Sequence, residues 1–173
     1  MTFRATVLAL TLSCPLALPA GAEVRAVLIG VADYAVLDAD LRGPVNDVRL
    51  MAETLVGRGV PVAGITVLST DSSGLPAGVA TGRADRAALL GALDAAAAAS
   101  APGDTLVFYF SGHGAQAPDL SGDEGGGYDE ILLPADAAGW KGSAQAVENA
   151  ILDDELQAWA QGANRLETGD FAL

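Results

Sequence analysis

Residues 105–116 have the sequence TLVFYFSGHGAQ, and this stretch decides the fold class. Its first half, 105–110, is rich in β-branched and aromatic residues and predicts a strand. Gly112 and Gly114 flank His113, the only histidine of the chain. Glycines on both sides let the backbone turn sharply and leave the imidazole reachable at the end of that strand. Because imidazole titrates near neutral pH, His113 is a candidate general acid and base; a structural loop histidine is the alternative.

The segments before this strand alternate between strand and helix patterns. Residues 24–31 form an almost continuous apolar run, which is typical of a strand buried on both faces. Helical periodicity follows at 46–58, and the alanine-rich segment 85–100 also favours a helix. A short strand is expected at 65–68, and the stretch 69–82, rich in Gly, Ser, Thr and Pro, predicts a loop. The alternation predicts an α/β fold, with a mostly parallel sheet flanked by helices.

The pattern weakens beyond His113. Residues 118–127 predict a loop with acidic residues and glycines, and 130–134 predict a fourth strand. Asp153 is a plausible N-cap for a further helix, with acidic residues in its first turn. The tail 161–173 has no clear apolar period, so no element is predicted there.

Residues 1–22 have the features of a secretory signal peptide. Arg4 supplies a positive start, an apolar run follows, and Ala20, Gly21 and Ala22 form a small-x-small cleavage site. The apolar run is too short for a relaxed transmembrane span. We therefore expect an exported protein, periplasmic or secreted, whose mature domain is 23–173 and has no stable membrane span. An uncleaved anchor is the alternative.

The formal net charge of −13 bears on possible partners. Such an acidic surface repels nucleic acid and anionic membranes, so we expect neither as a partner. It favours basic peptides or metal cations, although solubility alone also explains it. Cys14 is the only cysteine and lies within the expected signal, where it also permits a lipoprotein signal. The mature chain therefore has no thiol, no disulfide and no cysteine metal site.

Four stretches together resemble the caspase/metacaspase-type cysteine peptidases of peptidase family C14. They occur in the order and spacing of that family: 26–31, 41–48, 109–116 and 122–136. The resemblance implies a caspase-hemoglobinase-like fold that is incomplete at the C-terminus. The family's next strand and its Asp-x-Cys-like motif have no counterpart here, so the sequence is either truncated or a degenerate member. We favour truncation, because the motifs before the break are intact.

The resemblance also implies roles for particular residues. His113 would be the general base of a Cys-His dyad, and the backbone N–H of Gly114 a candidate oxyanion donor. Asp47 and Ser111 match substrate-pocket positions, which implies cleavage after Arg or Lys through charge-assisted hydrogen bonds. Asp47 equally suits a helix N-terminus. Arg42 competes with this interpretation, because caspases use arginines to hold a substrate aspartate.

A metal site is the last implication of the resemblance. Asp129, Asp153 and Asp154 match positions that bind activating calcium in some metacaspases, so calcium is the implied cofactor. A solvated acidic loop beside a helix-capping pair is the alternative. Three functions stay open. They are a cysteine endopeptidase domain for basic peptide or protein substrates, inactive as the 173-residue chain, a non-catalytic caspase-like binding domain, and an exported calcium-binding domain.

Overall fold

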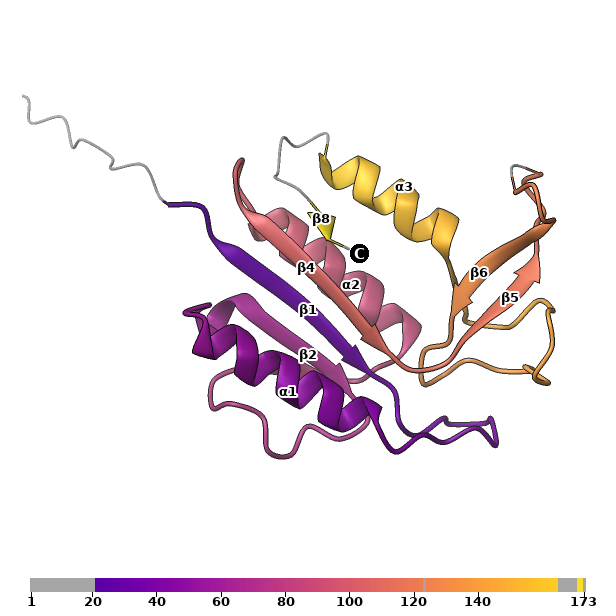
Figure 1. Ribbon diagram of the computed structural model, residues 1–173, viewed down its shortest axis with the longest axis horizontal. Helices are drawn as coiled ribbons and strands as arrows, with labels where there is room; N and C mark the ends of the chain where they lie inside the picture. The colour runs from indigo at the N-terminus through magenta and orange to yellow at the C-terminus, as the bar shows by residue number, and fades with distance from the viewer. Residues whose placement is uncertain (1–20, 123, 165–170, 173) are drawn as a thin grey trace, which may run out of the picture.

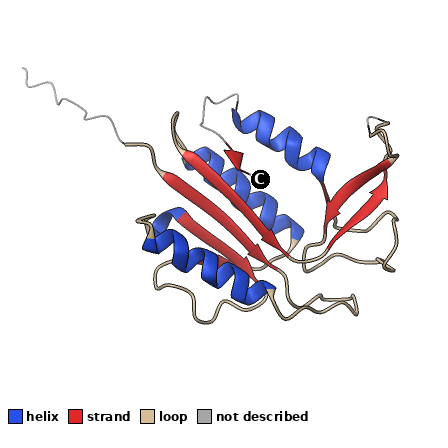
Figure 2. Cartoon of the chain, viewed as in Figure 1, coloured by secondary structure: helices blue, strands red, loops and turns tan. Residues whose placement is uncertain are grey.

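The computed structural model describes residues 21–122, 124–164 and 171–172. Helices lie on both faces of a larger sheet, and a small second sheet lies beside it (Figure 1, Figure 2). The larger sheet and its helices comprise β1 (Val24–Gly30), α1 (Pro44–Gly57), the 3-10 helix η1 (Val62–Gly64), β2 (Ile65–Ser69), β3 (Ala80–Gly82), α2 (Arg86–Ala99), β4 (Thr105–Ser111) and β8 (Phe171–Ala172). The second layer comprises β5 (Gly114–Pro118), β6 (Tyr128–Leu132), β7 (Ile151–Leu152) and α3 (Asp153–Asn164).

The larger sheet has the strand order β3-β2-β1-β4-β8, and every neighbouring pair is parallel. This confirms the predicted α/β class. The central strand β1 is apolar except at Arg25 because both of its faces are covered. Val27 and Ile29 pack in a core cluster with Leu89 and Leu93 of α2. The alternate side chains of β1 pack with α1 in the other cluster: Ala26, Leu28, Val48 and Ala52.

Close packing of α1 on β1 requires a glycine at the end of the strand. A Cβ on Gly30 would lie 2.7 Å from the carbonyl oxygen of Pro44 and 2.9 Å from a methyl of Val48. Pro44 begins α1, where its missing N–H has no intrahelical partner to lose. The helix therefore starts directly against the end of β1, and its first turn lies at the carboxyl edge of the sheet.

The structure adds strands that the sequence patterns did not predict. β3 lies within 69–82, which was expected to be a loop, and β5 directly follows His113. β5, β6 and β7 form the second, antiparallel sheet. β8 lies in the tail that had no clear period, and it pairs with Leu106 and Val107 of β4. The expected signal peptide falls almost entirely on 1–20, outside the described residues.

Arg86, at the start of α2, connects the larger sheet's helices to the segment that carries β5, β6, β7 and α3. Its guanidinium donates to the carboxylate of Glu155 on α3 and to the carbonyl of Ala150. Its backbone N–H donates to Asp136 at 2.9 Å, while Asp85 caps the same helix. The N-terminus of α2 thus holds the segment that follows β6. In the part of the chain that the structure describes, no helix has the length and apolar character needed to cross a membrane.

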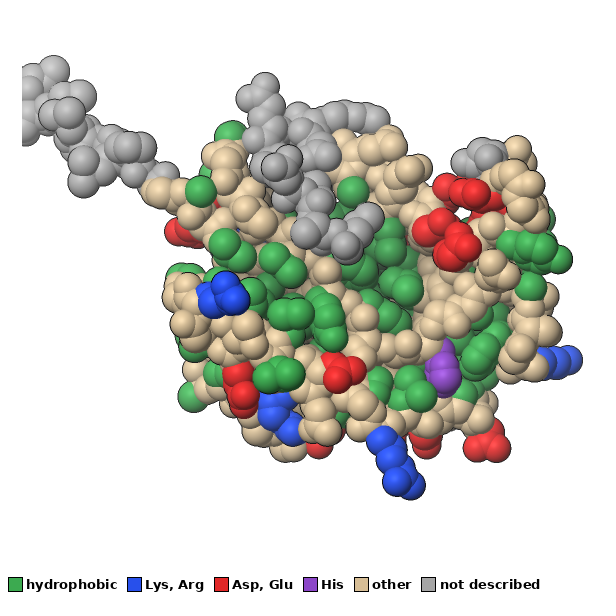
Figure 3. All heavy atoms as spheres, in the orientation of Figure 1, with side chains coloured by type: hydrophobic (Ala, Val, Ile, Leu, Met, Phe, Trp, Pro, Cys, Tyr) green, Lys and Arg blue, Asp and Glu red, His purple; other side chains and the backbone are tan. Residues whose placement is uncertain are grey.

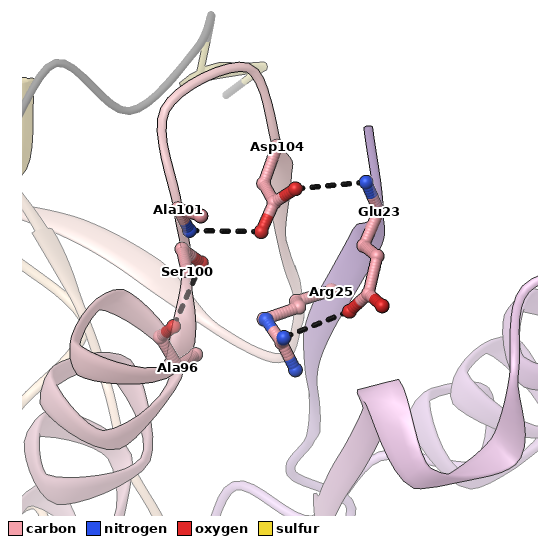
Figure 4. Close-up of polar contacts among 6 residues, drawn as sticks. All are labelled: Glu23, Arg25, Ala96, Ser100, Ala101 and Asp104. Atoms are coloured by element: carbon pink, nitrogen blue, oxygen red, sulfur yellow. Dashed lines mark hydrogen bonds and ion pairs between the residues drawn. The ribbon is translucent and has the colours of Figure 1, made fainter. Parts of the chain in front are cut away.

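Asp104 fastens the amino-terminal edge of the larger sheet (Figure 4). Its carboxylate accepts hydrogen bonds from the backbone N–H of Ala101 at 2.9 Å and of Glu23 at 2.8 Å, and the residue is 6% exposed. The backbone N–H of Thr105 in turn donates to the carbonyl of Glu23. The hydrogen bond from Ala101 above all, and that from Glu23, lower the pKa of Asp104 below its ordinary value of 3.8. The ionised carboxylate therefore stabilises the start of both β1 and β4.

We predict that Asp104→Asn destabilises the protein in a pH-dependent way. A depressed folded-state pKa gives stability that is fully present above the unfolded pKa of about 3.9 and is lost as pH falls through the folded value. Calorimetric or denaturant unfolding should show the variant less stable than the wild type at neutral pH. The difference in unfolding free energy between the two proteins should shrink in strong acid. The other carboxylates do not contribute to this difference, because both proteins contain them.

The control for this experiment is Asp38→Asn, which removes the same charge from an exposed loop residue. It should leave the unfolding free energy nearly unchanged at every pH. A stability difference between wild type and Asp104→Asn that is constant down to strong acid would contradict the assigned role of the carboxylate.

Candidate active site

The candidate site lies at the carboxyl edge of the larger sheet, between β1 and β4. The chain leaves β1 for α1 on one face, and it reaches β4 from α2 on the opposite face (Figure 1). Strand order therefore reverses between β1 and β4, and ligand sites of open parallel sheets form at such switch points. Ser111 is the last residue of β4, so His113 lies just beyond this edge.

The main chain of His113 is held from two sides. Its N–H donates to the hydroxyl of Tyr34 at 2.8 Å, and its carbonyl accepts from the N–H of Leu133 at 3.0 Å. Gly112 permits this path, because a Cβ there would lie 2.9 Å from the ring of Phe110. The glycine before the histidine therefore serves close packing at the strand end.

Three groups surround the half-buried His113 ring. The rings of Tyr34 and Trp140 lie with centroids 5.5 Å and 5.2 Å from it, and both are tilted relative to the imidazole. Its Nε2 lies 2.9 Å from the carbonyl oxygen of Ala39. Figure 3 shows the chain's single histidine reaching the surface among hydrophobic side chains.

The contact with Ala39 assigns the neutral tautomer of His113. A carbonyl oxygen only accepts hydrogen bonds, so Nε2 must carry the proton in the 2.9 Å contact. Nδ1 of the neutral ring then has the free lone pair and is the nitrogen that can accept a proton. The ring orientation thus follows from one backbone carbonyl.

Tyr34 is itself buried, with 7% of its surface exposed. Burial raises the pKa of its phenol, the hydrogen bond from the His113 N–H opposes this, and the charge of Asp40 adds to the rise. The hydroxyl therefore stays protonated around neutral pH, and its oxygen accepts from His113.

Asp47 and Ser111, which the resemblance matched to substrate-pocket positions, meet across the switch point. The Ser111 hydroxyl donates to a carboxylate oxygen of Asp47 at 2.6 Å. Asp47 is also an acidic residue of the first turn of α1, so the two interpretations of this residue are compatible. Burial raises the pKa of the Tyr109 phenol, and the negative charge of Asp47 raises it further. The Asp47 carboxylate therefore acts electrostatically on a side chain of β4 as well as on Ser111. Arg42 is exposed in the loop before α1.

Gly114 is exposed and begins β5. The N–H of Leu133 bonds to the carbonyl of His113, and Gly114 lies opposite Leu132 in the antiparallel register. Hydrogen-bonded and non-hydrogen-bonded pairs alternate along such a ladder. The N–H of Gly114 therefore points away from β6, where it is available to a ligand beside His113.

The three aspartates of the expected metal site do not converge. Asp129 on β6 is 2% exposed and lines a cavity of about 330 Å³ together with Asp154. Asp153 lines a different cavity of about 380 Å³, beside Glu130, and its Oδ1 is buried without a hydrogen-bond partner in the described chain. Among the described residues, no group of three or more His, Cys, Asp or Glu side chains is placed to hold a metal ion.

Sequence reasoning missed the residues that hold His113. Tyr34, Ala39 and Asp40 belong to the loop after β1, and Trp140 lies between β6 and β7, where no element was predicted. The available signal was positional, because a long loop at the carboxyl end of a central strand faces the switch point of the sheet. A carbonyl contact such as that of Ala39 leaves no trace in residue type.

The comparison with protein families gives one match over most of the chain. Residues 24–169 match the family described as "Metacaspase, peptidase C14 domain". Relatives include metacaspase-1A of Aspergillus terreus, 36% identical over 76% of this chain and 30% of the relative. Metacaspase-1 of Cryptococcus neoformans is 34% identical over 75% of this chain and 26% of its own length. The chain thus spans less than a third of these two curated relatives.

A solved structure agrees with these matches. Protein GSU0716 from Geobacter sulfurreducens superposes with a TM-score of 0.56 and 27% sequence identity, covering 79% of this chain and 44% of that one. With a family match across residues 24–169 and relatives at this level of identity, the chain belongs to the metacaspase family of peptidase C14 domains.

Proposed function

We propose that this domain is the histidine-bearing part of a cysteine-type endopeptidase, with His113 as general base. The observation that carries the proposal is the contact of Nε2 with the Ala39 carbonyl at 2.9 Å, which leaves Nδ1 free to accept a proton. The described residues contain no cysteine, since Cys14 lies outside them. The nucleophile of the proposed reaction therefore comes from outside the described part of the chain.

The proposed chemistry follows from the positions of these groups. Nδ1 of His113 takes the proton of a cysteine thiol, and the thiolate attacks the scissile carbonyl carbon. The N–H of Gly114, which points away from β6, donates to the developing oxyanion. The imidazolium then returns the proton to the leaving amine, and water hydrolyses the thioester to release the acid and the thiol.

We propose that the substrate residue before the cleaved bond is Arg or Lys. The carboxylate of Asp47 accepts a hydrogen bond at the switch point from Ser111, which lies two residues before His113 in the chain. A carboxylate recognises a guanidinium or ammonium by charge-assisted hydrogen bonds. The net charge of −13 adds an attractive field for basic peptides. Exposed Arg42 would instead favour an acidic residue, so the experiment below compares both.

We also propose calcium as a ligand, bound by Asp129 and Asp154. The two carboxylates share a cavity of about 330 Å³, and oxygen donors of this kind suit a hard cation. The remaining ligands would be carbonyls and water, because Asp153 lies over the neighbouring cavity. An acidic surface without a metal is the alternative.

We also propose that the protein is exported from the cytoplasm. Its support is the sequence of residues 1–22, with a positive start, an apolar run and a small-x-small site before Glu23. Cleavage there leaves β1 intact, since the strand begins at Val24.

We predict that the purified 173-residue chain binds a short Arg-terminated peptide amide without cleaving it. Chemical-shift changes should centre on Asp47, Ser111 and His113, and a matched peptide ending in Glu should bind more weakly. Asp47→Asn should weaken binding of the Arg peptide by about tenfold or more, the effect of one lost charge-assisted hydrogen bond.

The matched control is Glu53→Gln, which removes one negative charge from an exposed residue of the same helix. Equal affinity for both peptides, or equal loss in both variants, would contradict the pocket. Peptide cleavage that disappears in His113→Ala would instead show that the 173-residue chain already holds a nucleophile.

We predict that calcium raises the midpoint of thermal unfolding relative to the same protein in chelator. Binding to the folded state stabilises it by mass action. Asp129→Asn should reduce the calcium-dependent shift, and Glu124→Gln, an acidic residue of the neighbouring loop, should retain it. An identical midpoint in calcium and in chelator would remove calcium from the account.

A further inference from the structure

A ten-residue loop after β1 closes on itself beside His113. We call residues 32–41 the clamp loop. Its neck is closed by a hydrogen bond from the Leu41 N–H to the Ala32 carbonyl at 2.7 Å, and the Ala32 N–H donates to the Thr70 hydroxyl at 3.2 Å. Its first half is docked by a bond from the Ala35 N–H to the Ala135 carbonyl at 2.8 Å. The loop is therefore attached to the sheet at several points.

Asp40 determines the shape of the clamp loop from within. Its carboxylate accepts from the backbone N–H of Tyr34 at 2.9 Å, which brings the two halves of the loop together. Ala39, the neighbour of Asp40, then presents its carbonyl to Nε2 of His113, while Tyr34 presents its hydroxyl to the His113 N–H. The two contacts to the histidine thus come from Tyr34 and from Ala39, the chain neighbour of Asp40, and the hydrogen bond between Tyr34 and Asp40 connects them.

We propose that Tyr34 and Asp40 are positioning residues for His113: Tyr34 fixes its backbone, and Asp40 fixes the tautomer of its ring through the Ala39 carbonyl. This inference rests on the proposed function, in which a defined Nδ1 lone pair is needed for proton transfer. The inference concerns the orientation of the His113 ring and backbone, so it can be tested on the 173-residue chain even without peptidase activity.

The test uses the fact that the chain has one histidine. Long-range ¹H–¹⁵N correlation spectra report the tautomer of its neutral ring without assignment ambiguity. Asp40→Ala should convert a predominant Nε2–H form into a mixture. Asp38→Ala removes the same carboxylate from an exposed position of the same loop and should leave the spectrum unchanged. Asp40→Asn keeps an acceptor oxygen and should restore the wild-type tautomer.

Tyr34→Phe tests the backbone contact separately. Loss of the hydroxyl should speed hydrogen exchange of the His113 amide by about tenfold, the scale of one hydrogen bond. Tyr128→Phe removes a hydroxyl from an exposed tyrosine of β6 and should leave that rate unchanged. The proposal fails for either residue whose variant behaves like its control. Its failure is separate from that of the peptidase function, because neither readout depends on catalysis.

An independent observation concerns the other end of the sheet. Asp104 accepts a hydrogen bond at 2.8 Å from the backbone N–H of Glu23, the first residue after the expected cleavage site (Figure 4). Gly21 and Ala22 are exposed and lie before the first strand, so a peptidase can reach the bond. The buried carboxylate therefore faces the nitrogen that cleavage would release.

We infer that cleavage between Ala22 and Glu23 creates an ion pair that stabilises the mature fold. A signal peptidase would hydrolyse this amide bond with water, leaving a carboxylate on Ala22 and an amine on Glu23 that takes up a proton. The ammonium then replaces the amide as donor to Asp104, and charge-assisted hydrogen bonds are the stronger kind. Processing is thereby coupled to the stability of the β1–β4 edge.

The test compares the processed chain, beginning at Glu23, with a free or an acetylated amino group. The free form should unfold at a higher temperature, and Asp104→Asn should abolish the difference. A chain beginning at Ala22 displaces the ammonium by about 3.8 Å and should show no such difference on acetylation. Equal midpoints for the free and acetylated Glu23 chains would overturn the inference.

Discussion

Parallel pairing of β1 with β4 is the constraint on which the site depends. Seven residues of each strand are in register, from Val24 opposite Thr105 to Gly30 opposite Ser111. Parallel strands end at the same edge, so the loop after β1 and the histidine after β4 meet without any direct sequence relation. Both Asp47 and the clamp loop come from the β1 side, whereas Ser111 and His113 come from the β4 side.

The larger sheet could be predicted because its central strand β1 is buried on both faces. Nearly continuous apolar runs at β1 and β4, with helical periodicity between them, indicate a covered parallel sheet. β5 escaped prediction because its sequence, GAQAP, lacks β-branched and aromatic residues. Its strand geometry is imposed by pairing with β6, and tertiary pairing overrides weak local propensity.

The site was predictable where residue type carries the chemistry. His113 was singled out by its residue type and its flanking glycines, and Asp47 and Ser111 by the family resemblance; the last two side chains lie 2.6 Å apart. The separation of Asp153 from Asp154 could not be predicted, because both lie in the first turn of α3, where successive side chains point about 100° apart around the helix axis. Contacts made by backbone atoms, such as the Ala39 carbonyl, are invisible to residue patterns.

The described residues orient one imidazole through contacts with both its backbone and its ring. The two ends of the larger sheet have different tasks: Asp104 secures the amino-terminal edge, and the clamp loop organises the carboxyl edge. The most direct measurement is the tautomer of the neutral His113 ring in the wild-type chain, by long-range ¹H–¹⁵N correlation. We expect a proton on Nε2 and a free Nδ1, as the Ala39 contact requires. A ring protonated predominantly on Nδ1 would contradict it.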